Sequence, residues 1–233
     1  MTARTVVKTS RTRARIVGVI ASRSDLHLAS HLTTPPDLFE LRLDHLIGLL
    51  DELEKKAPIL RVPLIITARH PDEGGANQLS IQRRRELLLR FLPHARYVDV
   101  ELRSVRELRS VLELARRKKV HRIISFHELK ETPSARSLKA KARAAIAADA
   151  NSLKIATRTD TPAQLVRLLE FFVNEDVDLP ISAMGIGQLG AASRVVLAQL
   201  GSAFTYASIG RPTIEGQLSI RQLRSAFTAL KIE

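Results

Sequence analysis

Residues 122–162 read RIISFHELKETPSARSLKAKARAAIAADANSLKIATRTDTP, with two short apolar runs on either side of a segment that has helical periodicity. The runs, at residues 122–126 and 153–156, are typical of short buried strands. Thr132 and Pro133 place a capping hydroxyl just before a proline at the first helical position, so we predict a helix over residues 134–147. Two parallel strands joined by a helix explain this order.

The same order repeats along the whole chain. Further apolar runs lie at residues 16–20, 38–41, 64–67, 97–100, 181–184 and 204–207. Further helical segments are clearest at residues 79–91, 104–115, 161–173 and 217–230. About eight alternations, with no Pro-, Gly- or Ser-rich linker, predict an α/β protein with a single (β/α)8 TIM barrel around a parallel eight-stranded core. We expect one catalytic domain over residues 1–233, with residues 1–14 as a basic lead-in; a doubly wound open sheet is the alternative.

Composition limits the classes of protein that this chain can belong to. It has 233 residues, 45% of them apolar, which is enough for one substantial core. It contains no cysteine, which excludes disulfides, thiolate nucleophiles and cysteine-based metal sites. It has no apolar run near the ~20 residues of a membrane span, and residues 1–15 lack the apolar stretch of a secretory signal. We therefore expect a soluble, cytoplasmic protein without a membrane partner.

The charge is strongly positive, with a formal net value of +13 and a pI near 10.8. A nucleic-acid-binding or regulatory barrel is one interpretation, and steeply salt-dependent retention by DNA or RNA would identify it. However, only 4% of residues are aromatic, and basic runs such as residues 83–85 and 116–119 are spread along the chain as on solvated helix faces. We expect no nucleic-acid partner, and a basic surface that draws a small anionic substrate toward a cleft.

In a barrel of this kind, active sites lie where the strands end at their C-terminal side. The polar residues at those positions are Glu40, Arg42, Asp44, Arg69, Glu73, Asp99, Glu101, His127 and Lys154, followed by the loop after Tyr206. We expect these side chains to converge on one pocket.

Lys154 and His127 carry the sharpest chemical signal. Lys154 lies in a strand between apolar neighbours, where desolvation favours the neutral amine that forms Schiff bases with carbonyl compounds. His127 ends the preceding strand, roughly 5 Å away across a sheet, and histidine is the commonest general acid and base. We therefore predict that the two side chains act on the same bound molecule.

Six groups of residues in register resemble one family, the type I 3-dehydroquinate dehydratases. They are Phe39-Glu40-Leu41-Arg42-Leu43-Asp44, Thr67-Ala68-Arg69 leading to Glu73-Gly74-Gly75, Ser125-Phe126-His127 before Thr132-Pro133, Lys154-Ile155-Ala156, Ser193-Arg194, and Gly216-Gln217. The resemblance implies that Lys154 forms an imine with the C3 ketone of 3-dehydroquinate. His127 would then remove the C2 proton and protonate the departing C1 hydroxyl, a syn elimination that gives 3-dehydroshikimate. Glu73 would orient His127.

The resemblance also implies how the substrate is held. Arg194 would pair with its carboxylate, Glu40, Arg42 and Arg69 would hold the ring hydroxyls, and Thr213 and Gln217 would close over the ring. It implies a carbon–oxygen lyase of the shikimate pathway and aromatic amino acid biosynthesis, although quinate breakdown uses the same step. It implies no cofactor and no metal, and a homodimer. Another imine-forming, class I aldolase-like barrel lyase is the alternative; it would share Lys154 but need not share His127, Arg194 and Gln217.

Two features depart from the family pattern. The last loop has Thr213-Ile214-Glu215-Gly216-Gln217 where family members usually have Ser-Ala-Pro-Gly-Gln, which places a carboxylate near an anionic substrate. The turn at residues 184–194 is also longer than usual by about two residues. Within it, Gly185, Gly187 and Gly190 fit the dinucleotide fingerprint, but the strand after it has no acidic residue to bind a ribose. We therefore expect no NAD site, and the spacing of the seven histidines predicts no metal site.

Overall fold

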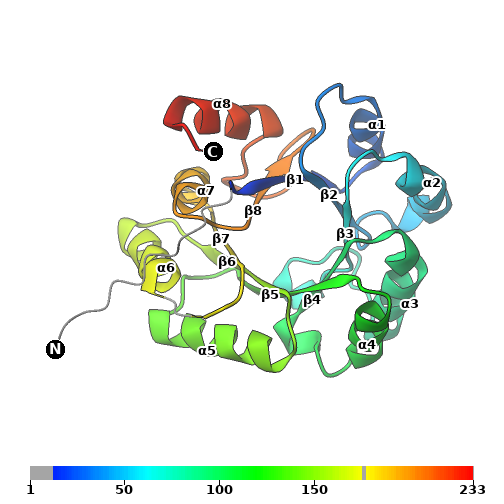
Figure 1. The fold of residues 1–233 in the computed structure, drawn as a ribbon, viewed down its shortest axis with the longest axis horizontal. Coiled ribbons are helices and arrows are strands. Elements are labelled where there is room, and N and C mark those ends of the chain that lie inside the picture. Colours follow the sequence, from blue (N-terminus) through cyan, green and yellow to red (C-terminus); the bar gives the residue numbers. More distant parts are fainter. Residues whose placement is uncertain (1–12, 175–176, 233) are drawn as a thin grey trace.

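Eight parallel strands surround a common axis in the computed structural model, which describes residues 13–174 and 177–232 (Figure 1). The strands are β1 (Arg15–Ile20), β2 (Leu38–Arg42), β3 (Leu64–Thr67), β4 (Tyr97–Glu101), β5 (His121–Glu128), β6 (Ser152–Arg158), β7 (Ile181–Ile186) and β8 (Phe204–Ser208). The helices are α1 (Arg23–His31), α2 (Leu50–Lys56), α3 (Ile81–Phe91), α4 (Arg109–Arg117), α5 (Ala135–Ala147), α6 (Pro162–Asn174), α7 (Gly190–Gln199) and α8 (Ile220–Leu230). The predicted (β/α)8 barrel is confirmed, and most of the expected lead-in at residues 1–14 lies outside the described residues.

The barrel is nearly closed. Strand pairing runs in the order β7-β6-β5-β4-β3-β2-β1-β8, so each strand is paired in parallel with its neighbours except across one seam. At that seam, between β7 and β8, the Ala203 N–H donates to the Ile181 carbonyl at 2.8 Å and the Phe204 N–H donates to the Ser182 hydroxyl at 3.0 Å. The open-sheet alternative is therefore wrong.

Two apolar layers result from the alternation of side chains along each strand. Outward residues such as Leu41, Val98 and Ile124 pack against the surrounding helices in the larger cluster. Inward residues such as Val17 and Ile65 fill the lower part of the barrel. Among the described residues, no helix is both long enough and apolar enough to cross a membrane.

Two helices begin three or more residues later than the sequence indicates. The segment expected at 104–115 starts with a short 3-10 turn, Leu102–Ser104, and α4 begins only at Arg109. The reason is tertiary, because the buried Ser104 hydroxyl accepts a hydrogen bond from Arg84 Nη1 at 3.1 Å. The segment expected at 217–230 starts at Ile220, where Ser219 and Gln222 form a capping box. Gln217 is therefore left in the preceding loop.

Candidate active site

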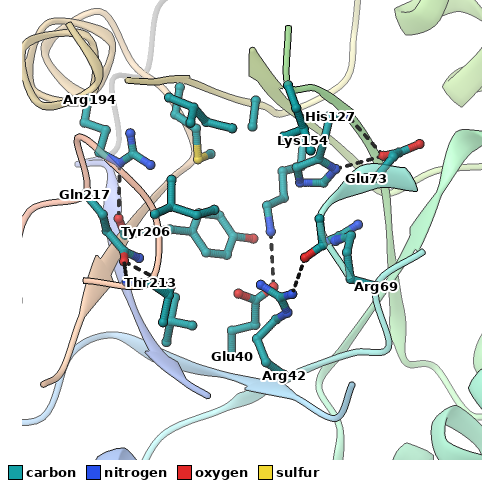
Figure 2. A pocket seen from close by; sticks show the side chains of 17 residues that line it. Glu40, Arg42, Arg69, Glu73, His127, Lys154, Arg194, Tyr206, Thr213 and Gln217 are labelled. Atoms are coloured by element: carbon teal, nitrogen blue, oxygen red, sulfur yellow. Dashed lines mark hydrogen bonds and ion pairs between the residues drawn. The ribbon is translucent and has the colours of Figure 1, made fainter. Parts of the chain in front are cut away.

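One pocket of about 270 Å³ opens at the C-terminal ends of the strands. All nine residues that the sequence predicts as catalytic or substrate-binding line it, namely Glu40, Arg42, Arg69, Glu73, His127, Lys154, Arg194, Thr213 and Gln217 (Figure 2). Drug-sized ligands occupy sites of roughly 300–1,000 Å³, so this volume suits a small metabolite. Four of them lie on strands β2, β5 and β6. Arg69 and Glu73 follow β3, Arg194 lies on α7, and Thr213 and Gln217 lie in the loop before α8.

Strand register sets the depth of Lys154 and His127. Lys154 is opposite Ser125 in the neighbouring strand, and His127 is opposite Ala156. Because side chains alternate with a period of two, Ser125, His127, Lys154 and Ala156 all point inward. The lysine lies deep in the barrel, and the histidine lies one inward position nearer the mouth.

Lys154 is 4% exposed and lies in a charged setting, not in the apolar one that its sequence neighbours predict. Its Nζ lies 3.1 Å from Glu40 Oε1 and 3.1 Å from Asp99 Oδ2. The ring centroid of Tyr206 lies 3.8 Å from the same atom. Two carboxylates and an aromatic face therefore surround Nζ, and these neighbours differ from the apolar surroundings that the sequence predicted. These three groups come from other strands, which the linear sequence does not place beside Lys154.

Arg69 lies beneath the pocket as a counter-ion. Its Nη2 lies 2.8 Å from Asp99 Oδ2, and its Nη1 lies 3.0 Å from Glu101 Oε1 and donates to the Ser125 hydroxyl at 2.6 Å. Burial opposes the charge on Asp99, but the charges of Arg69 and Lys154 outweigh burial and hold the pKa of Asp99 well below its usual range. Both terminal nitrogens of Arg69 are thus engaged by protein atoms, so the direct contact with a ring hydroxyl expected from the sequence would have to compete with them.

His127 and Glu73 form a close pair whose side chains are 8% and 5% exposed. The His127 backbone N–H donates to Glu73 Oε2 at 3.0 Å, and ring Nδ1 lies 2.9 Å from the same oxygen. Burial lowers the pKa of His127 well below its ordinary value, and the charges of Arg69 and Lys154 lower it further. Burial also raises the pKa of Glu73 to about 7. A neutral imidazole with Nδ1–H held by a carboxylate presents Nε2 as a base.

Arg42 acts on this pair through the backbone. Its Nε and Nη2 lie 3.0 and 2.8 Å from the carboxylate oxygens of Asp44, and Nη2 donates to the Gly74 carbonyl at 3.1 Å. Asp44 also accepts from the Ala76 N–H at 3.0 Å. These contacts fix the turn that carries Glu73, where Gly74 adopts φ +85°.

Arg194 is buried, and no carboxylate of residues 13–174 or 177–232 pairs with it. It is 3% exposed, and its guanidinium donates to the carbonyls of Gly185, Gly190 and Tyr206. Burial lowers the pKa of Arg194 to about 10. A buried cation that meets only neutral acceptors is poised to bind an anion, and it lines the pocket on the side away from His127 (Figure 2).

The lid loop, residues 211–217, carries Thr213 and Gln217 to the pocket. Gln217 Oε1 accepts from the Thr213 N–H at 3.1 Å. Glu215, the residue that departs from the family pattern, points to Arg158 at the end of β6, with Nη2 and Oε2 3.0 Å apart. Arg158 therefore neutralises the carboxylate that the sequence places near an anionic substrate.

The glycines of the fingerprint-like turn make room for this loop. The Gly187 N–H donates to the Glu215 carbonyl at 3.1 Å. A Cβ on Gly190 would lie 3.0 Å from Gly216 Cα, and Gly187 has φ +102° with Asp160 against the site of its missing Cβ. Close backbone packing accounts for the pattern without a dinucleotide.

Two neighbours of Lys154 were given no chemical role in the sequence-based prediction. Asp99 was identified as a strand-end residue, but its pairing with Lys154 depends on closure of the barrel. Tyr206 was used only to mark the end of a strand, although its position as an inward residue of β8 would have placed it in the pocket.

Comparison with known proteins agrees with this geometry. The family model described as type I 3-dehydroquinase matches residues 17–233. A 3-dehydroquinate dehydratase of Thermococcus onnurineus is 34% identical over 216 residues, which cover 91% of this chain and 96% of the relative. One from Pyrococcus abyssi is 32% identical over 81% of this chain and 85% of its own length. The crystal structure of 3-dehydroquinate dehydratase from Geobacillus kaustophilus superposes with a TM-score of 0.82 at 26% identity and covers 94% of this chain and 92% of the other. The chain belongs to the type I 3-dehydroquinase family.

Proposed function

We propose that this pocket converts 3-dehydroquinate to 3-dehydroshikimate by Schiff-base-mediated syn elimination of water, as a hydro-lyase of the shikimate pathway. The observation that carries the proposal is the presence, in one pocket, of a buried lysine and a neutral histidine whose second nitrogen is held by a carboxylate. A primary amine supplies the electron sink, and the histidine supplies the base.

The first half of the reaction forms the imine. The neutral His127 takes the proton of the Lys154 ammonium, and the free amine attacks the C3 carbonyl. A proton moves from nitrogen to oxygen to give a carbinolamine. His127 returns its proton to the carbinolamine hydroxyl, which leaves as water, so the carbon–nitrogen double bond forms as a cationic imine.

The second half eliminates water. The cationic imine acidifies the adjacent C2 position, and His127 removes the C2 proton to give an enamine. The enamine expels the C1 hydroxyl, which takes the proton from His127 and leaves as water. Hydrolysis then releases 3-dehydroshikimate and restores the Lys154 ammonium. Glu73 holds Nδ1–H throughout, so that Nε2 is the atom that exchanges protons.

Substrate binding uses the remaining pocket residues. Arg194 grips the carboxylate, since its buried guanidinium has only neutral acceptors among the described residues. Glu40 and Arg42 reach the ring hydroxyls, and Arg69 pairs with Asp99, which in turn pairs with Lys154. Thr213 and Gln217 cover the ring and exclude water when the lid loop is closed.

The setting of the reaction follows from the same proposal. Residues 1–233 act as one catalytic domain in the cytoplasm, as a homodimer, without a nucleic-acid partner. The formal charge of +13 attracts the anionic substrate, so kcat/KM falls as salt screens the surface. Sedimentation of the purified protein tests the dimer, and retention by DNA at low salt tests the absence of a nucleic-acid partner.

Borohydride trapping tests the central step. We expect a substrate-dependent mass increase that peptide mapping places on Lys154 and that disappears in Lys154→Ala. The exposed Lys130, close to the pocket mouth after β5, provides the matched control, and Lys130→Ala should trap as the wild type does. An adduct that is absent, or scattered over surface lysines, would refute the proposal.

A further inference from the structure

Tyr206 lies against the reacting amine and has no role in the steps above. It is an inward residue of β8, 3% exposed, and its ring centroid lies 3.8 Å from Lys154 Nζ. In Figure 2 the ring lies between Lys154 on one side and Arg194 and Gln217 on the other, and its hydroxyl end is directed toward the Lys154 side. The ring therefore forms the wall of the pocket beside Lys154 Nζ, the atom that forms the imine.

The hydroxyl of Tyr206 is the unusual part of this side chain. It is buried, and among the described residues it has no hydrogen-bond partner. A buried polar atom without a partner is destabilising and calls for an explanation. A phenylalanine would provide the same ring face for Lys154 without that penalty, so packing and the cation–π contact do not explain the oxygen.

The surroundings also fix which hydrogen-bonding role the hydroxyl can have. Burial raises the pKa of Tyr206 well above its ordinary value, and the charges of Glu40 and Asp99 raise it further. Its surroundings therefore favour the protonated phenol, which is a neutral donor. A donor aimed at a position where negative charge develops stabilises the transition state.

We propose that the Tyr206 hydroxyl donates a hydrogen bond to the C3 oxygen of the substrate while Lys154 forms the carbinolamine. The proposal rests on the imine chemistry proposed above. When Nζ attacks, the C–N bond forms, the π bond of the carbonyl breaks, and its electron pair moves to oxygen. That oxygen is then two bonds from Nζ, next to the ring that Nζ already contacts. Tyr206 keeps its proton, and the proton that converts the alkoxide to a hydroxyl comes from the attacking nitrogen.

Tyr206→Phe tests the proposal, because it keeps the ring face and removes only the oxygen. We expect imine formation, followed by rapid-quench borohydride trapping, to slow by about 10- to 100-fold, the effect of losing one hydrogen bond to a charged group. We also expect the kinetic isotope effect of C2-deuterated substrate to fall toward unity, because formation of the imine becomes rate-limiting. A merely structural role would not move this isotope effect.

The chain offers a matched control, since it contains only two tyrosines. The Tyr97 hydroxyl accepts from Arg15 at 3.1 Å at the other end of the barrel, outside the pocket lining. Tyr97→Phe should keep the wild-type imine rate and isotope effect. In that background, biosynthetic replacement of tyrosine by 3-fluorotyrosine changes position 206 alone. A more acidic phenol should speed imine formation, and this measurement stands even if Tyr206→Phe does not fold.

The outcomes separate this inference from the proposed function. If the wild type traps substrate on Lys154 and Tyr206→Phe forms the imine at the same rate with an unchanged isotope effect, the role of Tyr206 is refuted and the imine mechanism stands. An absence of any response to fluorination would refute it in the same way. If the wild type itself forms no adduct, both proposals are wrong.

Discussion

Arg194 allows a quantitative prediction about substrate recognition. Burial lowers its pKa from the ordinary value of a guanidinium to about 10. At about 1.4 kcal/mol for each unit of pKa, burying this side chain in its charged form lowers the free energy of unfolding by about 3 kcal/mol. A folded-state pKa below the unfolded one means that this destabilisation is fully present at neutral pH and is lost only as the pH rises through about 10 toward the ordinary pKa of a guanidinium. A bound carboxylate would recover most of it.

We therefore expect Arg194→Gln to weaken binding of the substrate by about 300-fold, which corresponds to about 3 kcal/mol. The ligand-free variant should unfold with a free energy no lower than that of the parent, because a buried charge is removed while an amide can still donate to the carbonyls. Calorimetric titration in the Lys154→Ala background measures binding without turnover. Denaturant unfolding measures the stability.

A second ligand makes the test specific. The neutral carboxamide of the substrate should bind the parent about 300-fold more weakly than the acid does, and this preference should collapse in Arg194→Gln. Arg211→Gln removes the same charge from an exposed position in the lid loop and should keep the preference. If Arg194→Gln weakens the acid and the amide equally, Arg194 does not bind the carboxylate.

Two further predictions concern the base and the lid loop. Because burial raises the pKa of Glu73 to about 7, kcat should fall as the pH drops through about 7, where protonated Glu73 no longer holds His127 Nδ1–H. Glu73→Gln should lower kcat by roughly 100-fold and remove this acid limb between pH 5 and 9; a limb that persists in the variant belongs to another group. Glu215→Gln should raise KM by only a few-fold, since the pair with Arg158 is partly exposed and solvent weakens it. High salt should raise the KM of the wild type but not of the variant, and a KM equally salt-sensitive in both would show that this pair does not hold the loop.

Most of the architecture could be predicted from the sequence because it depends on local periodicity. Both ends of each of the eight strands lie within two residues of the ends of an apolar run identified from the sequence. The start of α5 was predicted to within one residue, but the predicted cap was wrong. Ser134 caps the helix and its hydroxyl accepts from the Ser137 N–H, whereas the Thr132 hydroxyl donates to the Arg158 carbonyl at 2.6 Å. The start of α4 was wrong because Ser104 bonds to Arg84, a residue twenty positions away, which no local pattern records.

The sequence predicted which residues form the site, but it did not predict which of their charged groups form pairs. Strand ends in a barrel converge, so polar residues there could be assigned to one pocket without coordinates. Which cation meets which anion depends on the tilt and stagger of the strands around the barrel. The surroundings of Lys154 show this, since Glu40 lies 114 positions away in sequence and Asp99 lies 55 away. Its neighbours in sequence are apolar, and its neighbours in space are two carboxylates.

The pairing predicts that the pocket accepts an anion on one side only. Each of the other cations in and beneath it has its own carboxylate, in the pairs Arg42–Asp44, Arg69–Asp99, Arg84–Glu101 and Lys154–Glu40. Among the described residues of the pocket, the one buried cation that meets only carbonyls is Arg194. A carboxylate placed near Lys154 would compete with Glu40 and Asp99, whereas one placed at Arg194 balances a charge that the fold leaves open. With the roles proposed above, the charges would therefore orient the substrate with its carboxylate at Arg194 and its ketone toward Lys154, before any shape complementarity acts.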